Sequence, residues 1–158
     1  MNRRHFMTTT AAALGLGPTL ARAAEGEFEV TRTDAEWKAM LTDLEYKVMR
    51  EEGTERAFTS PLNDIKEPGT FLCKGCDLPL YATAQKFDSG TGWPSFWAPV
   101  DEANVETKTD RSFFMTRTEV HCRRCGSHLG HIFEDGPPPT GLRHCINGVS
   151  LTFTPASA

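Results

Sequence analysis

The sequence of 158 residues contains no hydrophobic run long enough to span a bilayer. Its most apolar stretch, residues 11–20, is short and is interrupted by Gly15, Gly17 and Pro18. A basic surplus is also missing, because 17 Lys and Arg stand against 21 Asp and Glu, a formal charge of −4. Nucleic-acid binding requires a basic face, so this balance argues against a nucleic-acid partner. The sequence therefore predicts neither a membrane span nor a nucleic-acid-binding function.

The first 23 residues carry the features of an export signal. Arg3 and Arg4 precede the apolar stretch, and residues 1–23 contain no acidic residue. Ala21-Arg22-Ala23 matches an A-x-A cleavage site. The pattern predicts a twin-arginine signal and a periplasmic location, with a buried N-terminal helix as the alternative. Residues 24–158 then form a single domain by length.

Two short helices are expected before the strands. Thr33 and Thr42 each stand three residues before a glutamate, which is the pattern of a capping box, and Gly53 is expected to end the second helix. From residue 70 onward, short runs of Phe, Val, Thr and Tyr alternate with turns of Gly, Pro and Asp. Strands are expected at residues 70–72, 80–82, 111–120, 129–133, 142–146 and 149–153. The predicted class is mainly β, with antiparallel sheets in a barrel-like core flanked by short N-terminal helices.

Four of the five cysteines form two Cys-x-x-Cys pairs. The pairs are Cys73 with Cys76, and Cys122 with Cys125. Two such pairs are the ligand set of a closed tetrahedral Zn²⁺ site, in which no position stays open for a substrate. Because 45 residues separate the pairs, the metal is expected to join distant segments and to be structural. Two strained local disulfides and a thioredoxin-like redox pair are the alternatives.

The fifth cysteine, Cys145, stands alone in R-H-C-I-N and is a candidate nucleophile. In a strand, Arg143 and Asn147 share its face because side chains alternate between the two faces. A nearby guanidinium lowers the pKa of a thiol by favouring the thiolate, and an amide can hold a substrate oxygen or a water. The alternative is that Cys145 is a small buried apolar residue.

Three further residues are candidates for the site. His128 and His131 form H-L-G-H, and if four cysteines fill the metal site, both histidines are free for acid–base chemistry. Zinc ligation and hydrogen-bonded packing are the alternatives for these histidines. Trp93 follows a glycine in G-T-G-W-P-S-F-W and can form the wall of a cleft, although core packing is the more common fate of a tryptophan.

Together these segments resemble the methionine sulfoxide reductase family of the B type. The motifs occur in the order C-x-x-C, F-D-S-G-x-G-W-P-S-F, C-x-x-C, H-L-G-H-I-F-x-D-G-P and P-T-G-L-R-x-C-I-N. The resemblance covers residues 41–153. It implies antiparallel sheets in a barrel-like core, and reduction of the R epimer of methionine sulfoxide in peptides and proteins.

The resemblance also implies a role for each candidate residue. Cys145 would attack the sulfoxide sulfur, and His131 would protonate the sulfoxide oxygen with the help of His128 and Asn147. Trp93 would form the apolar wall that receives the substrate methyl group. The residues that would tune and orient the site are Arg143 and Asp135. The ligands of one structural Zn²⁺ would be Cys73, Cys76, Cys122 and Cys125.

Some positions depart from the usual pattern of that family. Thr91 stands where many members carry a recycling cysteine, and the sequence has no spare cysteine. A sulfenic acid on Cys145 is therefore expected to be reduced by an external thiol, such as a thioredoxin-like periplasmic protein. His144 replaces an aromatic residue and should point away from the face of Cys145, and Gly148-Val149 replaces a Ser-Ala pair.

Two other functions use part of the same features. A zinc-knuckle binding module needs no fifth cysteine, and a peroxide-sensing thiol protein would react with peroxide but ignore chiral sulfoxides. We therefore expect a monomeric, zinc-stabilised reductase that acts on oxidised proteins or peptides.

Overall fold

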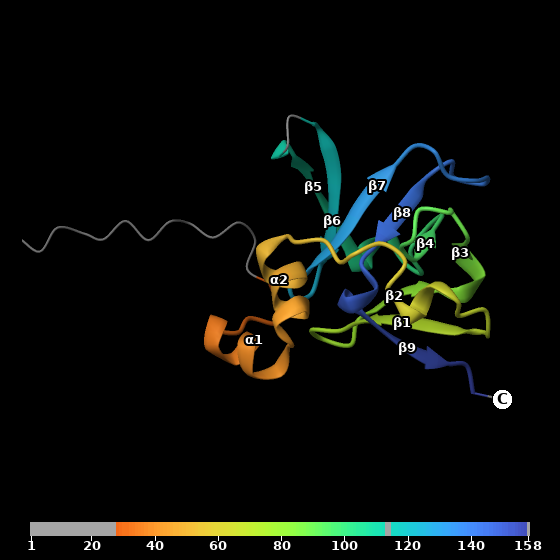
Figure 1. The fold of residues 1–158 in the computed structure, drawn as a ribbon. Coiled ribbons are helices and arrows are strands. Elements are labelled where there is room, and N and C mark those ends of the chain that lie inside the picture. The colour runs from red at the N-terminus through yellow and green to blue at the C-terminus, as the bar shows by residue number, and fades with distance from the viewer. Residues whose placement is uncertain (1–27, 113–114, 158) are drawn as a thin grey trace, which may run out of the picture.

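Two short helices lead into nine β-strands in the computed structural model, which describes residues 28–112 and 115–157 (Figure 1). The export signal expected at residues 1–23 lies outside the described residues. In the part of the chain that is described, no helix is long and apolar enough to cross a membrane.

The helices begin where the sequence predicts. α1 spans Asp34–Met40 and α2 spans Asp43–Glu51. In the first capping box the Thr33 hydroxyl accepts from the Glu36 amide, and the Glu36 carboxylate accepts from the Thr33 amide at 2.8 Å. The same reciprocal pair occurs at the start of α2. Each box satisfies two backbone amides that have no partner within the helix.

The end of α2 differs from the prediction. The residue with left-handed backbone is Glu52, with φ of 56°, and not Gly53. Gly53 contributes in another way, because a Cβ at this position would lie 2.8 Å from the Lys47 carbonyl oxygen. Glycine therefore permits the Gly53 amide to donate to that carbonyl at 2.9 Å.

The strands form two open antiparallel sheets. The smaller sheet has the order β2-β1-β9 and the larger sheet the order β3-β4-β8-β7-β6-β5. The strand bounds are β1 Gly69–Cys73, β2 Pro79–Ala82, β3 Lys86–Phe87, β4 Ser95–Phe96, β5 Val105–Asp110, β6 Arg117–Cys122, β7 His128–Phe133, β8 Arg143–Ile146 and β9 Leu151–Pro155. The mainly antiparallel class is confirmed, but the sheets do not close into a barrel.

The strand predicted at residues 111–120 is wrong at its start. β5 ends at Asp110, the chain turns, and β6 begins at Arg117. β5 itself is missing from the sequence-based prediction because its pattern V-E-T-K-T-D buries only Val105 at this edge of the sheet. β9 begins two residues later than predicted, since residues 148–150 form a 3₁₀ turn.

Aromatic side chains from both sheets meet in the core. The rings of Tyr81 on β2 and Phe96 on β4 stack with centroids 4.5 Å apart, and Phe71 on β1 meets Phe96 at 5.1 Å. All three side chains are fully buried. Large aromatic contacts of this kind bury much apolar area and hold the two sheets face to face.

His144 belongs to this core. Its side chain points away from the half-buried Cys145, as strand alternation predicts, and its Nδ1 lies 3.1 Å from the Tyr81 hydroxyl. Burial lowers the pKa of His144 to about 4. The folded protein therefore holds this imidazole neutral at pH values where an unfolded chain, with a histidine pKa of about 6.5, would already be protonated.

This difference predicts a pH-dependent stability. Because the folded pKa is depressed, the free energy of unfolding should fall as the pH drops below about 6.5, by roughly 2 kcal/mol between pH 7.5 and pH 5 for this one group. His144→Phe should remove that part of the pH dependence. Urea unfolding of both proteins at the two pH values measures it. Equal pH dependence in the two proteins would show that His144 is not held neutral.

Candidate active site and metal centre

The two Cys-x-x-Cys segments form turns of the same geometry. Cys73 is the last residue of β1 and Cys122 is the last residue of β6. Four residues after each, the amides of Asp77 and Gly126 donate back to the carbonyls of Cys73 and Cys122, both at 2.8 Å. Both residues have left-handed backbone, with φ of 56° and 67°. Each turn thus brings its two sulfurs to the same side of the strand end.

The four sulfurs of these turns lie together. The Sγ atoms of Cys73 and Cys125 are 3.6 Å apart, those of Cys76 and Cys122 are 3.5 Å apart, and all four lie within 4.8 Å of one another. Tetrahedral zinc with Zn–S bonds of about 2.3 Å requires sulfurs about 3.8 Å apart. The cluster therefore fits Zn²⁺, and four thiolates leave no open coordination position. Both of these short sulfur contacts run between the pairs and all four cysteines are free thiols, which argues against the alternative of two local disulfides.

This cluster joins the two sheets. Cys73 ends a strand of the smaller sheet, whereas Cys122 ends β6 of the larger sheet and Cys125 lies in the turn that leads to β7. The Arg124 side chain reinforces the contact by donating to the Cys76 carbonyl at 3.2 Å. A metal at this point closes a long loop of chain, so its binding free energy stabilises the folded arrangement of the sheets.

Cys122→Ser should therefore lose zinc and unfold at markedly lower urea concentration, because one of the four ligands that join the sheets is removed. Cys145→Ser is the matched control, since it makes the same chemical change outside the cluster and should keep one zinc per chain. Metal analysis and urea unfolding measure both effects. Full zinc content and unchanged unfolding in Cys122→Ser would contradict the structural role.

The candidate nucleophile and the candidate proton donor are direct neighbours. Cys145 on β8 is paired with Ser95 on β4 and with His131 on β7, and His131 is paired with Glu119 on β6. Side chains of directly opposed residues lie on one face with Cβ atoms about 4.5–5.5 Å apart. A single row across the sheet thus carries a hydroxyl, a thiol, an imidazole and a carboxylate.

Gly130 explains how β7 and β8 approach so closely beside this row. A Cβ at Gly130 would lie 2.0 Å from the carbonyl oxygen of Cys145. Any larger residue would push the two strands apart and separate Cys145 from His131. The glycine of H-L-G-H is therefore required by the position of the thiol.

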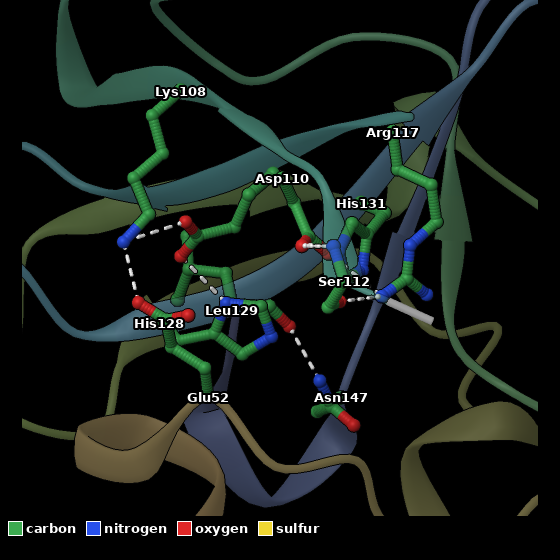
Figure 2. A network of polar contacts seen from close by, with 10 residues as sticks. Glu52, Lys108, Asp110, Ser112, Arg117, His128, Leu129, His131 and Asn147 are labelled. Atoms are coloured by element: carbon green, nitrogen blue, oxygen red, sulfur yellow. Dashed lines mark hydrogen bonds and ion pairs between the residues drawn. The ribbon is translucent and has the colours of Figure 1, made fainter. Parts of the chain in front are cut away.

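Each imidazole is held by a carboxylate, and Figure 2 shows the network around them. His131 Nε2 lies 2.8 Å from Asp110 Oδ2, and His128 Nδ1 lies 2.7 Å from Glu119 Oε1. The two rings meet edge to face with centroids 5.5 Å apart. The sequence indicates neither acid, because each lies on another strand, Glu119 9 residues from His128 and Asp110 21 residues from His131.

The environments of the two imidazoles differ. Burial lowers the pKa of His128 to about 4, so this ring is neutral near pH 7. Burial also lowers the pKa of His131, but its hydrogen bond to Asp110 opposes the shift. His131 is therefore the better placed of the two to take up and release a proton.

Arg143 is fixed beside the thiol by Asp135. Its Nε and Nη2 donate to the two oxygens of Asp135 at 2.8 and 2.9 Å, and its guanidinium lies 4.4 Å from the centre of the Phe133 ring. Burial raises the pKa of the Cys145 thiol, and the Arg143 charge opposes that shift without overcoming it. The predicted influence of Arg143 is thus present, but burial outweighs it.

Trp93 and Asn147 are both organised by Glu55, a residue that the sequence did not indicate. The Trp93 indole donates to the Glu55 carbonyl at 3.1 Å, and the Glu55 amide donates to Asn147 Oδ1 at 3.0 Å. The buried Glu55 carboxylate accepts from the amides of Gly148 and Val149. A Cβ at Gly148 would collide with Ser60, which explains why glycine stands there.

The side-chain amide of Asn147 is held at both ends by backbone groups. Besides accepting from Glu55, its amide donates to the Leu129 carbonyl at 2.9 Å. Leu129 lies between the two histidines of H-L-G-H, on β7. Asn147 therefore ties the end of β8 to the segment that carries His128, in addition to any contact with a substrate.

Thr91 lies in a chain of hydroxyl groups that ends beside Cys145. Ser89 Oγ lies 2.8 Å from Thr91 Oγ1 and 2.7 Å from Ser95 Oγ, and Ser95 is the cross-strand neighbour of the thiol. Hydroxyl groups can donate to an anionic sulfur or to an oxygen bound to it.

A family model described as the SelR domain matches residues 41–155, which is most of the chain. This chain belongs to the SelR family. Three relatives carry the name peptide methionine sulfoxide reductase MsrB. The protein of Pseudomonas putida (strain W619) is 56% identical over 128 residues, covering 80% of this chain and 96% of that protein. The protein of Thiobacillus denitrificans is 52% identical, over 78% of this chain and 94% of that protein. The protein of Hahella chejuensis is 50% identical, over 79% of this chain and 90% of that protein.

Within this SelR-family site, the balance between burial and Arg143 predicts the reactivity of Cys145. Arg143→Met should raise the pKa of the thiol further and slow its alkylation by iodoacetamide at pH 7.5 by roughly tenfold, because an adjacent opposite charge shifts a pKa by about 1–3 units. The exposed Arg111→Met is the control. Peptide mapping assigns the adduct to Cys145, and equal rates in all three proteins would contradict the electrostatic role of Arg143.

Proposed function

We propose that this SelR-family chain is a peptide-methionine (R)-S-oxide reductase that repairs oxidised proteins. The names of relatives that are about half identical over almost their whole length support this function. The observation that carries it is the cross-strand pair of Cys145 and His131, which sets a thiol next to an imidazole on one sheet face.

The chemistry needs both groups at once. The Cys145 sulfur attacks the sulfoxide sulfur while His131 gives a proton to the sulfoxide oxygen, which is a poor leaving group until it is protonated. The oxygen then passes from the methionine sulfur to the cysteine sulfur. The methionine sulfur gains two electrons and Cys145 loses two, so the products are methionine and a sulfenic acid on Cys145.

The surrounding residues bind and orient the substrate in this proposal. Trp93 forms the apolar wall that receives the substrate methyl group, held in place by its bond to Glu55. Arg143 favours the thiolate, Asp135 orients the Arg143 guanidinium, and His128 and Asn147 support His131 from the neighbouring positions. The two epimers of a sulfoxide differ in the arrangement of the oxygen, the methyl group and the lone pair around sulfur. Only one epimer can place its methyl group against Trp93 and its oxygen next to the His131 imidazole.

The sulfenic acid is recycled by an external thiol in this proposal. A first thiol displaces water from Cys145 to form a mixed disulfide, and a second thiol releases Cys145 and forms the disulfide of the reductant. Thr91 stands in the hydroxyl chain beside Cys145 and has no sulfur with which to form an internal disulfide. A thioredoxin-like protein of the same compartment would supply both thiols from its own dithiol pair.

Residues 1–23 are proposed to export residues 24–158, as a monomer, to the periplasm through the twin-arginine route. Export of a folded protein allows zinc to bind in the reducing cytoplasm, before the thiols meet an oxidising compartment. The ratio of zinc to protein in material isolated from the periplasm tests this proposal. One zinc per chain supports it, and disulfides without zinc contradict it.

The reductase activity is tested with the two epimers of methionine sulfoxide placed in one peptide, with dithiothreitol as reductant. The R epimer should be reduced, the S epimer should not, and Cys145→Ser should abolish the reaction while keeping zinc. Methionine formation measured by chromatography gives the result.

Two outcomes would contradict the proposal. Reduction by Cys145→Ser would remove Cys145 as the nucleophile. Rapid reaction of Cys145 with hydrogen peroxide, together with no reduction of either epimer, would favour a peroxide-sensing thiol protein instead.

A further inference from the structure

The two carboxylates that contact the histidine rings, those of Asp110 and Glu119, have no role in the chemistry described so far. Asp110 is the last residue of β5, and Glu119 is on β6 with only 2% of its surface exposed. Each contacts one nitrogen of one imidazole, Nε2 of His131 and Nδ1 of His128. A buried carboxylate is costly unless it is paired, so both contacts require an explanation.

A carboxylate fixes the tautomer of the imidazole that it contacts. An ionised carboxylate only accepts hydrogen bonds, so the proton of the neutral ring must lie on the contacted nitrogen. His131 then keeps Nδ1 free, and His128 keeps Nε2 free. The free His128 Nε2 is buried and has no hydrogen-bond partner among the described residues. It is an acceptor that a water or a substrate can satisfy.

The two carboxylates are themselves held from several directions. The Ser112 amide and Arg117 Nη2 donate to Asp110 at 2.9 and 2.7 Å. The pKa of the Asp110 carboxyl is lowered mainly by the Ser112 hydroxyl and amide, and further by His131 and Arg117. Lys108 lies 3.0 Å from Glu119 and also pairs with Glu52 (Figure 2). Asp110 is therefore kept ionised, and Lys108 places a positive charge beside Glu119, so both carboxylates are held in place as a positioning group requires.

We propose that Asp110 and Glu119 are the positioning residues of this site, with Asp110 fixing His131 as the proton donor and Glu119 fixing His128 as a hydrogen-bond acceptor. The proposal rests on the proposed reductase function. In it, His131 takes a proton on Nδ1 while Asp110 balances the charge of the ring, and the free Nε2 of His128 orients the water or substrate group that enters the site.

Removal of either negative charge has a defined consequence. In Asp110→Asn the amide can present either an oxygen or an NH₂ group to His131, so the tautomer is no longer fixed. Loss of the Asp110 charge also lowers the pKa of His131, because that charge favours the protonated ring. The rate of the reductase step should therefore begin to fall at a lower pH than in the wild-type protein. A general acid contributes about 10²–10⁴-fold, and we expect its positioning group to contribute about 10- to 100-fold of this.

The groups that face His131 come from every neighbouring strand. They are Asp110 on β5, Arg117 and Glu119 on β6, His128 on β7, and Arg143 and Cys145 on β8. Among residues 28–112 and 115–157, Asp110 alone forms a hydrogen bond with a nitrogen of the His131 ring. A shift of the pH profile in Asp110→Asn that is absent in a control carboxylate variant is therefore assigned to that contact.

Glu106→Gln is the matched control. Glu106 lies on the same strand as Asp110, and its carboxylate is 3.5 Å from Nε2 of His121. Glu106 and His121 are not part of the proposed catalytic machinery. Asp110→Asn, Glu119→Gln and Glu106→Gln are prepared with zinc bound, and methionine formation in a single turnover is followed from pH 5.5 to pH 9. The ¹⁵N signals of the imidazole nitrogens report the tautomers in the same proteins.

The wild-type protein should show His131 protonated at Nε2 and His128 protonated at Nδ1. Asp110→Asn should lose the tautomer of His131, slow the single turnover about 10- to 100-fold at pH 7.5 and move the profile to lower pH. Glu119→Gln should lose the tautomer of His128 and slow the same step. Glu106→Gln should change none of these readouts.

Opposite tautomers in the wild-type protein, or an unchanged pH profile and rate in Asp110→Asn, would overturn the proposal. Asp110 lies at the edge of the sheet, so its variant decides the question even if Glu119→Gln does not fold. If the wild-type protein reduces neither epimer, the proposed function fails, but the nitrogen signals still test the tautomers.

Discussion

The contact between two sulfur pairs at the ends of β1 and β6 is the constraint on which the fold depends. β1 belongs to the smaller sheet and β6 to the larger one, and a metal shared by Cys73, Cys76, Cys122 and Cys125 fixes one sheet against the other. A second connection runs nearby, where β8 continues through residues 147–150 into β9 and the Lys74 amide donates to the Ser150 carbonyl at 2.9 Å. The strand that carries Cys145 is thus connected to the Cys73 turn through residues 147–150 and this hydrogen bond.

The active site uses the simplest way in which a sheet can bring residues together. Directly opposed positions on β4, β8, β7 and β6 place Ser95, Cys145, His131 and Glu119 in one row, and Gly130 lets the two central strands approach without a steric clash. The row costs no special backbone conformation, because register alone creates it. The opposite face of the same strands packs into the core through His144, Phe96 and Tyr81. A shift by one residue would therefore exchange the reactive face with the core face, and the buried aromatic contacts oppose such a shift.

The features that could be predicted from the sequence are those that short spacing determines. Two Cys-x-x-Cys pairs and two Thr-x-x-Glu boxes describe local turns, and the structure forms both as expected. The candidates Cys145, His128 and His131 were visible because their types are rare and their motifs compact. Glu55, Asp110 and Glu119 were not visible, since glutamate and aspartate are common and their partners lie 9 to 94 residues away along the chain. The edge strand β5 was missed for a related reason, because an almost wholly exposed strand carries no alternation of apolar and polar residues.

We propose that a metal withholds four thiols from chemistry and leaves Cys145 as the sulfur that reacts. A single turnover of the zinc-loaded protein with R-sulfoxide peptide, without reductant and in the presence of a sulfenic-acid probe, tests it most directly. Peptide mapping should find one adduct per chain, on Cys145, and metal analysis should find the zinc still bound. Adducts on the other cysteines, or a disulfide between Cys145 and a cluster cysteine with release of zinc, would contradict the account.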